Sequence, residues 1–346
     1  MPSPSSIIIL TSILTALISL FLALRPLYTE TETMTSLQQI RAQLPDIQRL
    51  GPGLVGVFVG ATGGICEHTA REFARHAASP RIYIIGRNAT AGTALVSEFQ
   101  TLNSGASVQF IQSDVSLLRN VDAVCAEISA KESKINLLML SAGIMTLSRD
   151  ETTEGIDRKL ALHYYSRVRF TQNLLPLLRA ATDSPLARIV SVLGGGYEWA
   201  ASRIDPNNLD LKTGYGVSAA AGYATTMQTL AWWHLAADPA NKGISFLHLQ
   251  PGGVNTGLAK KSFGPVVGGI LNGLFTLIPS KYASTPEVAG ERTAFVAALA
   301  KVGDGARLVA RDGAETGDAK VLKGLKEAGL EEKVWAHTEE VFKGIE

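Results

Sequence analysis

Short apolar runs alternate along most of the chain with longer stretches in which apolar residues recur every three to four positions. The short runs are apolar on both faces, which is typical of parallel strands covered by helices on two sides. Seven runs predict strands, at Gly53–Val59, Arg81–Ile85, Val108–Gln112, Ile135–Leu140, Ala187–Val192, Ile244–Leu249 and Ala306–Ala310. The alternation predicts a single α/β domain built on a doubly wound parallel sheet of about seven strands, with helices on both faces.

The periodic stretches between these runs predict the helices. A long pattern covers Leu160–Ala181, and another helix is expected at Pro286–Ala300. Between the sixth and seventh strands, Phe263–Thr285 is rich in glycine, proline and bulky apolar residues and interrupts the alternation. We expect an insertion of this composition to cover an apolar ligand. The final residues, Lys320–Glu346, predict a helical cap on the surface.

The N-terminal segment does not fit the alternating pattern. Ile7–Leu24 is an apolar run of 18 residues interrupted only by Thr and Ser, and Arg25 ends it. As a helix it spans roughly 27 Å, close to the apolar thickness of a bilayer. We therefore expect a membrane anchor and tether at residues 1–33, a domain at residues 34–346, and a location at the endoplasmic reticulum with the domain in the cytosol. Two alternatives stay open, a cleaved signal peptide and a cytoplasmic protein that starts at Met34.

Charge and the numbers of cysteine and histidine argue against several functions. The chain has 32 Lys and Arg against 31 Asp and Glu, which gives no electrostatic sign of nucleic-acid binding. Its two cysteines cannot form a disulfide framework and indicate a reducing compartment. The six histidines are scattered without the spacing of metal ligands, so no metal site is expected.

A glycine-rich loop follows the first predicted strand and leads into a helix. Gly60 ends the strand and Gly64 opens the helix. This geometry lets backbone N–H groups of the loop, around Thr62 and Ile65, approach a pyrophosphate at the helix N-terminus. Because the loop lies between a strand and a helix, the motif predicts a dinucleotide site.

Arg87 follows the second predicted strand, 27 residues after Gly60. A carboxylate at this place binds the ribose hydroxyl of NAD, whereas an arginine suits the 2′-phosphate of NADP. The sequence therefore favours NADP(H) as the cofactor.

Five motifs occur in the order and spacing of one enzyme family. They are Gly-x-x-x-Gly-Ile at 60–65, Gly-Arg at 86–87, SDVS at 113–116, LSAG at 140–143 and PGGVNTG at 251–257. On these motifs the chain resembles the short-chain dehydrogenases/reductases, in particular the branch common in fungal secondary-metabolite pathways. The resemblance extends over nearly all of the chain from Met34 onward and implies a Rossmann-type fold.

The resemblance also implies further contacts with the cofactor. Asp114 would lie at the adenine ring, and Ala142 and Gly143 would line the ribose side. Val254 and Thr256 would hold the nicotinamide carboxamide.

One position of the glycine motif departs from the family. Cys66 stands where a third glycine is usual. A side chain at this position is expected to crowd either the contact between helix and strand or the phosphate, although a thiol is small.

Most of the family's catalytic positions are replaced. The resemblance implies a proton-exchanging tyrosine, a serine that hydrogen-bonds the carbonyl oxygen, a lysine four residues after the tyrosine and an asparagine on the preceding long helix. Tyr215 matches the tyrosine, while Gly194, Ala219 and His163 occupy the other three positions. Without the lysine, Tyr215 stays protonated near neutral pH, which hinders oxidation more than reduction. His163 is the second candidate for a proton donor.

Three functions follow from these features. The first is an NADPH-dependent reductase of a small, apolar metabolite in a secondary-metabolite pathway, favoured by Arg87 and the carboxamide loop. The second is a non-redox cyclase, isomerase or dehydratase, and the third is a cofactor-binding scaffold without turnover; the absent serine and lysine favour these two. The oligomeric state stays open, because Trp232 and Trp233 suit either a core or the interface of a homo-oligomer.

Overall fold

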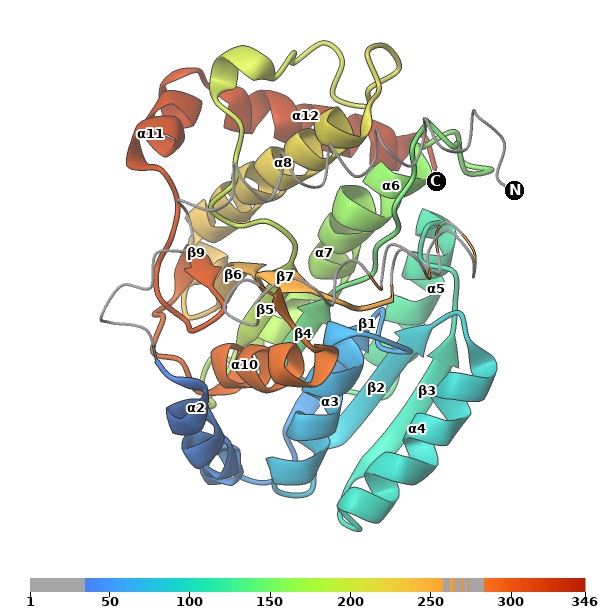
Figure 1. The fold of residues 1–346 in the computed structure, drawn as a ribbon, viewed down its shortest axis with the longest axis vertical. Coiled ribbons are helices and arrows are strands. Elements are labelled where there is room, and N and C mark those ends of the chain that lie inside the picture. The colour runs from blue at the N-terminus through green and yellow to red at the C-terminus, as the bar shows by residue number, and fades with distance from the viewer. Residues whose placement is uncertain are drawn as a thin grey trace. The chain divides into compact units, whose positions relative to one another are not determined.

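A seven-stranded parallel sheet organises the protein (Figure 1). The computed structural model describes residues 35–257, 262, 264, 269, 273 and 283–345. The strands, in the order β3-β2-β1-β4-β5-β6-β9 across the sheet, are β1 (Val55–Val59), β2 (Arg81–Gly86), β3 (Ser107–Gln112), β4 (Leu137–Leu140), β5 (Arg188–Val192), β6 (Ser245–Gln250) and β9 (Gly305–Ala310). All seven predicted strands are confirmed, with ends that differ by two residues at most. The five inner strands are buried along nearly their whole length, whereas the edge strands β3 and β9 are largely half-buried or exposed.

Helices cover both faces of this sheet, as predicted. One face packs against α3 (Ile65–His76), α4 (Ala89–Leu102), α10 (Pro286–Ala298) and the short α2 (Leu37–Gln43). The other packs against α5 (Leu118–Ser129), α7 (Ser166–Arg179) and α8 (Val217–Ala237). The fold is therefore the doubly wound Rossmann-type arrangement, in which ligands bind at the carboxyl edge of the sheet.

The long helix predicted at Leu160–Ala181 is present but is interrupted near its start. The chain passes from α6 (Arg158–Leu160) through a π-helical turn, η3 (Ala161–Tyr165), into α7. Arg167 contributes to this turn, because its side-chain Nε donates to the carbonyl of Leu162, 3.1 Å away. Single π-helical turns inside α-helices are frequent at functional sites.

The C-terminal helices, α11 (Ala319–Glu327) and α12 (Leu330–Lys343), pack more deeply than the predicted surface cap. The hydroxyl of Tyr164 lies 2.6 Å from Thr338 Oγ1, and that of Tyr165 lies 2.8 Å from His337 Nε2. Phe342 is buried in the same core. Helix α12 is thus part of the hydrophobic core, and its two hydrogen bonds hold the π-helical turn in place.

We expect Phe342→Ala to lower the free energy of unfolding by about 3–5 kcal/mol, because it removes a buried ring and leaves a cavity. Urea unfolding measures the change. The matched control is Lys343→Ala at the neighbouring exposed position, which should stay within about 0.5 kcal/mol of the parent protein. A loss below about 1 kcal/mol for Phe342→Ala would show that α12 adds little to stability.

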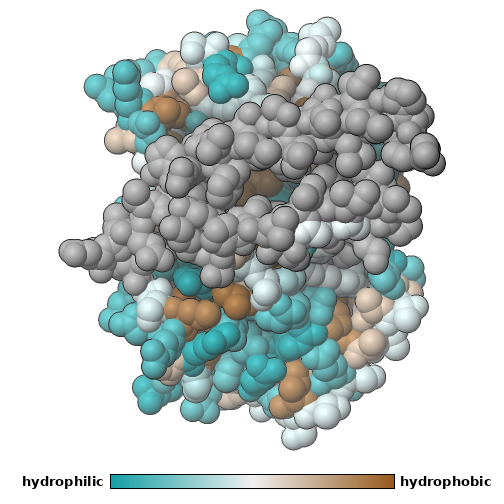
Figure 2. Space-filling view, viewed as in Figure 1, coloured by the Kyte–Doolittle hydropathy of each residue, from teal (hydrophilic) through white to brown (hydrophobic). Residues whose placement is uncertain are grey.

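The two adjacent tryptophans have different environments. Trp232 is buried, and its indole N–H donates to the carbonyl of Leu247. Trp233 contacts α11, where the ammonium of Lys326 lies 4.9 Å from the ring centre. Figure 2 shows hydrophobic side chains scattered among hydrophilic ones on the coloured part of one face. Neither observation identifies an interface, and the oligomeric state stays a prediction.

The predicted membrane location needs correction. No helix within 35–257 or 283–345 is both long and apolar enough to cross a bilayer, so the prediction of a membrane-anchored protein at the endoplasmic reticulum is wrong. The anchor at residues 7–24 and most of the cover at 263–285 lie outside the described residues. An apolar run meets only the hydropathy requirement, whereas a span also needs a continuous helix that satisfies the backbone hydrogen bonds.

Candidate active site

A cavity of about 520 Å³ lies at the carboxyl edge of the sheet. Its walls are the loop after β1, the ends of β2, β4 and β5, the π-helical turn, and the loop after β6. Strands β1 and β4 are neighbours in the sheet although β2 and β3 come between them in the sequence. This is the topological switch point, where doubly wound sheets bind their ligands.

The loop after β1 approaches the neighbouring strand through its backbone. Gly60 has a φ of +82°, and a Cβ atom there would lie 2.6 Å from the backbone nitrogen of Ala142. Gly64 has a φ of +76° and precedes the first residue of α3, Ile65. Both conformations favour glycine, and together they direct the N-terminus of a 12-residue helix at the cavity. The predicted Thr62, Gly64 and Ile65 all line the cavity.

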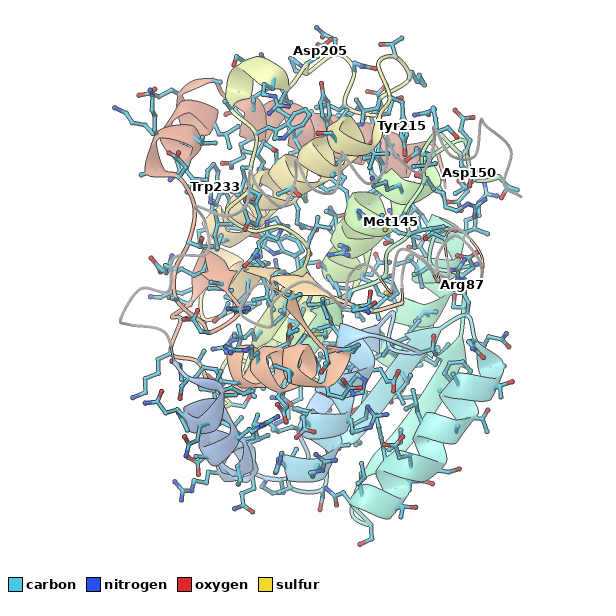
Figure 3. All side chains as sticks on the ribbon, in the orientation of Figure 1. Arg87, Met145, Asp150, Asp205, Tyr215 and Trp233 are labelled. Carbon is cyan, nitrogen blue, oxygen red and sulfur yellow. The ribbon has the colours of Figure 1, made fainter. Side chains whose placement is uncertain are left out.

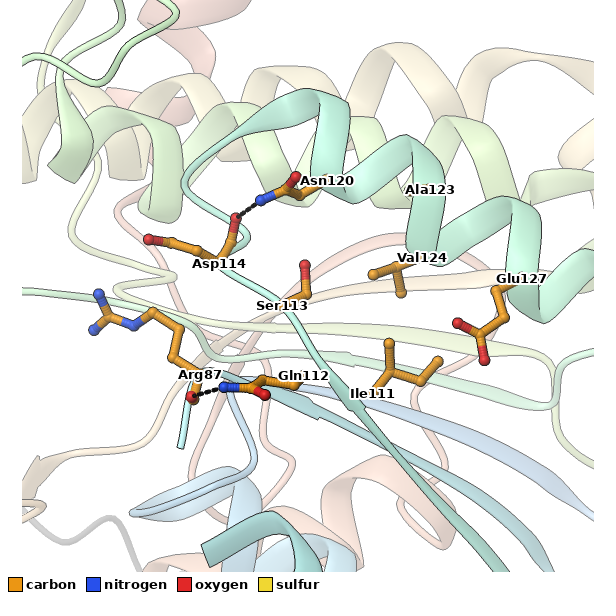
Figure 4. A pocket seen from close by; sticks show the side chains of 9 residues that line it. All are labelled: Arg87, Ile111, Gln112, Ser113, Asp114, Asn120, Ala123, Val124 and Glu127. Atoms are coloured by element: carbon orange, nitrogen blue, oxygen red, sulfur yellow. Dashed lines mark hydrogen bonds between the residues drawn. The ribbon is translucent and has the colours of Figure 1, made fainter. Parts of the chain in front are cut away.

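Arg87 and Asp114 connect this cavity to a second one. The second cavity, of about 540 Å³, lies between β3 and α5, and both residues line the two cavities (Figure 4). Ser116 donates to the Asp114 carboxylate from its backbone N–H and its hydroxyl, 3.0 and 2.8 Å away. Arg87 is exposed and forms no ion pair within the part of the chain that the structure describes. Its guanidinium is therefore free to meet an anionic ligand.

Cys66 does not take part in the cavity wall. Its side chain is fully buried in the core beneath α3, beside Phe58 and Phe73. Burial raises the pKa of the thiol, so it is neutral and acts as a small apolar group. Of the two expected effects of the missing third glycine, crowding of the phosphate is not seen, since Cys66 is fully buried and does not line the cavity.

The π-helical turn brings His163 to the cavity. The residue is half-buried, and its Nε2 accepts a hydrogen bond from the backbone N–H of Ile144, 3.2 Å away. Desolvation lowers the pKa of His163 well below its usual value, and the cations of Arg167 and Lys159 lower it further. The imidazole is therefore neutral near pH 7, with its hydrogen on Nδ1. It lines the cavity as predicted, but not as the protonated donor that its usual pKa suggested.

Tyr215 lies just before α8 and is absent from the lining of the cavity. Its hydroxyl is 2.9 Å from Thr146 Oγ1, in the loop that continues from Ala142 and Gly143. Figure 3 shows Met145, in this loop, between Tyr215 and Arg87 in that view. Burial raises the pKa of Tyr215, so the hydroxyl keeps its proton.

Thr225, on α8, lies beside Gly194, the position of the family serine. A Cβ atom on Gly194 would lie 3.0 Å from Thr225 Oγ1, so Thr225 is the α8 residue beside it. Thr225 comes six residues after Ala219, which is about 9 Å further along a helix. Thr225 is therefore the side chain beside Gly194, and the placement of Ala219 at the family's lysine position stays a prediction.

Arg167 is a site residue that the sequence reasoning missed. It lines the cavity next to His163 and is only 2% exposed. An arginine inside an amphipathic helix usually faces solvent, so the pattern gave no signal for its burial. Its four hydrogen-bond acceptors are side-chain and backbone oxygens on three different elements.

Comparison with known proteins agrees with this geometry. The family model for short chain dehydrogenases matches residues 55–265. The chain belongs to the short-chain dehydrogenase/reductase family. It is 36% identical to Oxidoreductase AN1596 of Emericella nidulans, over 89% of this chain and 98% of that protein. It is 33% identical to Oxidoreductase andH of Emericella variicolor, over 90% and 98%.

Solved structures show the same fold. NADPH-bound carbonyl reductase from chicken fatty liver has a TM-score of 0.57 at 16% identity, over 77% of this chain and 99% of that one. An alcohol dehydrogenase from Thermococcus sibiricus, complexed with 5-hydroxy-NADP, has a TM-score of 0.54 at 16% identity, over 74% and 95%. These structures show the fold, while the family match and the relatives identify an oxidoreductase of the short-chain dehydrogenase/reductase type.

Proposed function

We propose that this dehydrogenase/reductase uses NADPH to reduce a small, apolar metabolite in a fungal secondary-metabolite pathway. The observation that carries the proposal is the cavity at the switch point, with a glycine loop and a helix N-terminus at one wall and the unpaired Arg87 at its end. The fungal oxidoreductases that match nearly the full chain support it.

The residues of the cavity fit a dinucleotide. Gly60 and Gly64 leave room for a pyrophosphate that the N-terminus of α3 would bind, and Arg87 would pair with a 2′-phosphate. Val254 and Thr256 also line the cavity, where they would hold the carboxamide, and Thr256 lies beside Gly64. When bound, NADPH supplies a hydride to an electrophilic carbon of the substrate.

The protein's own part in the chemistry is to deliver a proton. Tyr215 keeps its proton at neutral pH and shares a hydrogen bond with Thr146, in the loop whose first residues line the cavity. We assign proton donation to the Tyr215 hydroxyl. His163, being neutral, orients the loop through Ile144.

We expect the parent protein to bind NADPH more tightly than NADH. Arg87→Asp should weaken NADPH at least about tenfold, because it replaces a charge-assisted pair by repulsion. Calorimetric dissociation constants for both cofactors measure this. Arg49→Asp, the same charge change at an exposed position of the 3₁₀ helix before β1, serves as the control and should leave both values unchanged. Equal affinities of the parent protein for NADPH and NADH would argue against the 2′-phosphate assignment.

A non-redox reaction in the same cavity is the second candidate. It is favoured by Gly194 and Ala219, which offer neither a serine hydroxyl nor a lysine ammonium at the positions to which the resemblance assigns these groups. Following NADPH absorbance during turnover distinguishes the two. A cyclase, isomerase or dehydratase forms its product without consuming the cofactor, and a scaffold forms none.

A further inference from the structure

Arg167 is a buried cation without a carboxylate partner. Its guanidinium donates to Ser191 Oγ and to the carbonyls of Val192 and Ala142, each 2.8 Å away, besides Leu162. All four acceptors are neutral. Burial lowers the pKa of Arg167 to about 9, which still leaves it charged at neutral pH. A full positive charge therefore lies in the wall of the cavity, with no negative side chain bonded to it.

A second cation lies nearby on the same stretch of helix. Lys159 is 4% exposed, and its ammonium donates to the carbonyl of Val217, 3.1 Å away. It precedes His163 by four residues, Arg167 follows His163 by four, and both cations lower the pKa of His163. Neither cation forms an ion pair in the described ranges. The buried carboxylate of Asp157, two residues before Lys159, offsets part of the charge of Lys159, so the positive charge beside His163 comes mainly from Arg167.

The acceptors of Arg167 place that charge along the cavity. Ala142 follows β4 and Val192 ends β5, so the guanidinium lies at the carboxyl edge of these two strands. Arg87 and Asp114 stand at the end of β2 and after β3, on the other side of β1. If Arg87 meets the adenosine phosphate, as the proposed function requires, the buried charge acts at the nicotinamide end.

We propose that Arg167 and Lys159 make this site prefer the reduced dinucleotide over the oxidised one, with Arg167 carrying the larger share because it lines the cavity. The inference rests on the proposed function. The nicotinamide ring is neutral in NADPH and positive in NADP⁺, so a fixed cation repels only the oxidised form. Two unit charges about 10 Å apart at an effective dielectric constant of about 20 change an affinity roughly tenfold. A reductase benefits from this difference in affinity, because it must bind NADPH before the reaction and release NADP⁺ after it.

The hydrogen bonds of Arg167 would be the same if its role were only structural. Arg188 allows the two roles to be distinguished. It is a buried arginine that donates to the carbonyls of Val296 and Ala300, again without a carboxylate. It stands at the opposite end of β5, four residues before Val192, or roughly 13 Å along a strand. Arg188→Met therefore removes a buried clamp without changing the charge at the cavity.

The experiment measures the dissociation constants of NADPH and NADP⁺ by calorimetry on the full chain. We expect the ratio of NADP⁺ to NADPH constants to fall about tenfold in Arg167→Met and less in Lys159→Met. It should stay near the parent value in Arg167→Lys, which keeps the charge, and in Arg188→Met. If Arg167→Met does not fold, Lys159→Met and Arg167→Gln still remove a charge and test the proposal.

The outcomes separate the inference from the function on which it rests. A parent protein that binds neither dinucleotide contradicts the proposed function, and the inference falls with it. Binding of both, with a ratio that Arg167→Met and Lys159→Met leave unchanged, overturns the inference alone. An equal fall of the ratio in Arg188→Met would also overturn it, since that would show a loss of structure rather than of charge.

Discussion

Gly60→Val should raise the dissociation constant for NADPH at least about 100-fold. At a φ of +82° a β-branched residue is strained, by about 1–3 kcal/mol or more. Its Cβ would also lie 2.6 Å from the nitrogen and 2.7 Å from the Cα of Ala142, both backbone atoms that cannot turn aside. The loop must therefore move away from β4, and the cradle for the pyrophosphate opens. Calorimetry on the purified variant measures the loss.

Gly155→Val is the control that separates strain from collision. Gly155 has a φ of +76°, close to that of Gly60, but a Cβ atom there meets nothing within 4 Å. It does not line the cavity. We expect this variant to lose stability while it binds NADPH as the parent does. Binding by Gly60→Val at near-parental affinity would show that the loop after β1 is not the phosphate site.

Tyr215→Phe should lower the rate of NADPH consumption about 10²-fold while leaving NADPH affinity nearly intact, since a general acid contributes on that scale. The variant keeps the ring and removes only the hydroxyl that is bonded to Thr146. Tyr223→Phe is the matched control, because that hydroxyl accepts from the backbone N–H of Asp205 and lies in the core. It should cost stability but little turnover. Full activity of Tyr215→Phe on the true substrate would show that another group donates the proton.

The pH dependence of the same reaction follows from the raised pKa of Tyr215. The donor is active in its protonated form, which is present at every pH below that pKa. Reduction should therefore be nearly constant between about pH 6 and about pH 9 and fall only as the pH rises through the tyrosine range. His163 should add no step near its usual pKa, because desolvation keeps it neutral. A step that disappears in His163→Gln would contradict this assignment.

Local signals predicted the fold well. Buried inner strands leave apolar runs, and glycines with positive φ leave a motif, so the seven strands of the main sheet and the loop at Gly60 could be predicted from the sequence. The membrane location was predicted wrongly, because hydropathy alone does not establish a span; the apolar run at residues 7–24 lies outside the described residues.

Contacts between distant segments were not readable. Arg167 bonds Ser191 and Val192, which lie 24 and 25 residues away, and nothing in its own helix indicates this. The placement of Ala219 stays a prediction for a related reason. Tyr215 precedes α8, so the four residues from Tyr215 to Ala219 are not a spacing along one helix.

The anchoring of the π-helical turn by α12 has a consequence for biosynthesis. The hydroxyls of Tyr164 and Tyr165 meet Thr338 and His337, 174 and 172 residues later and close to the end of the chain. Until those residues have left the ribosome, two buried hydroxyls lack their partners, which is costly for a closed core. The wall that carries His163 thus reaches its final form only after residues 337 and 338 have been synthesised, so products that terminate before them should lack a working site.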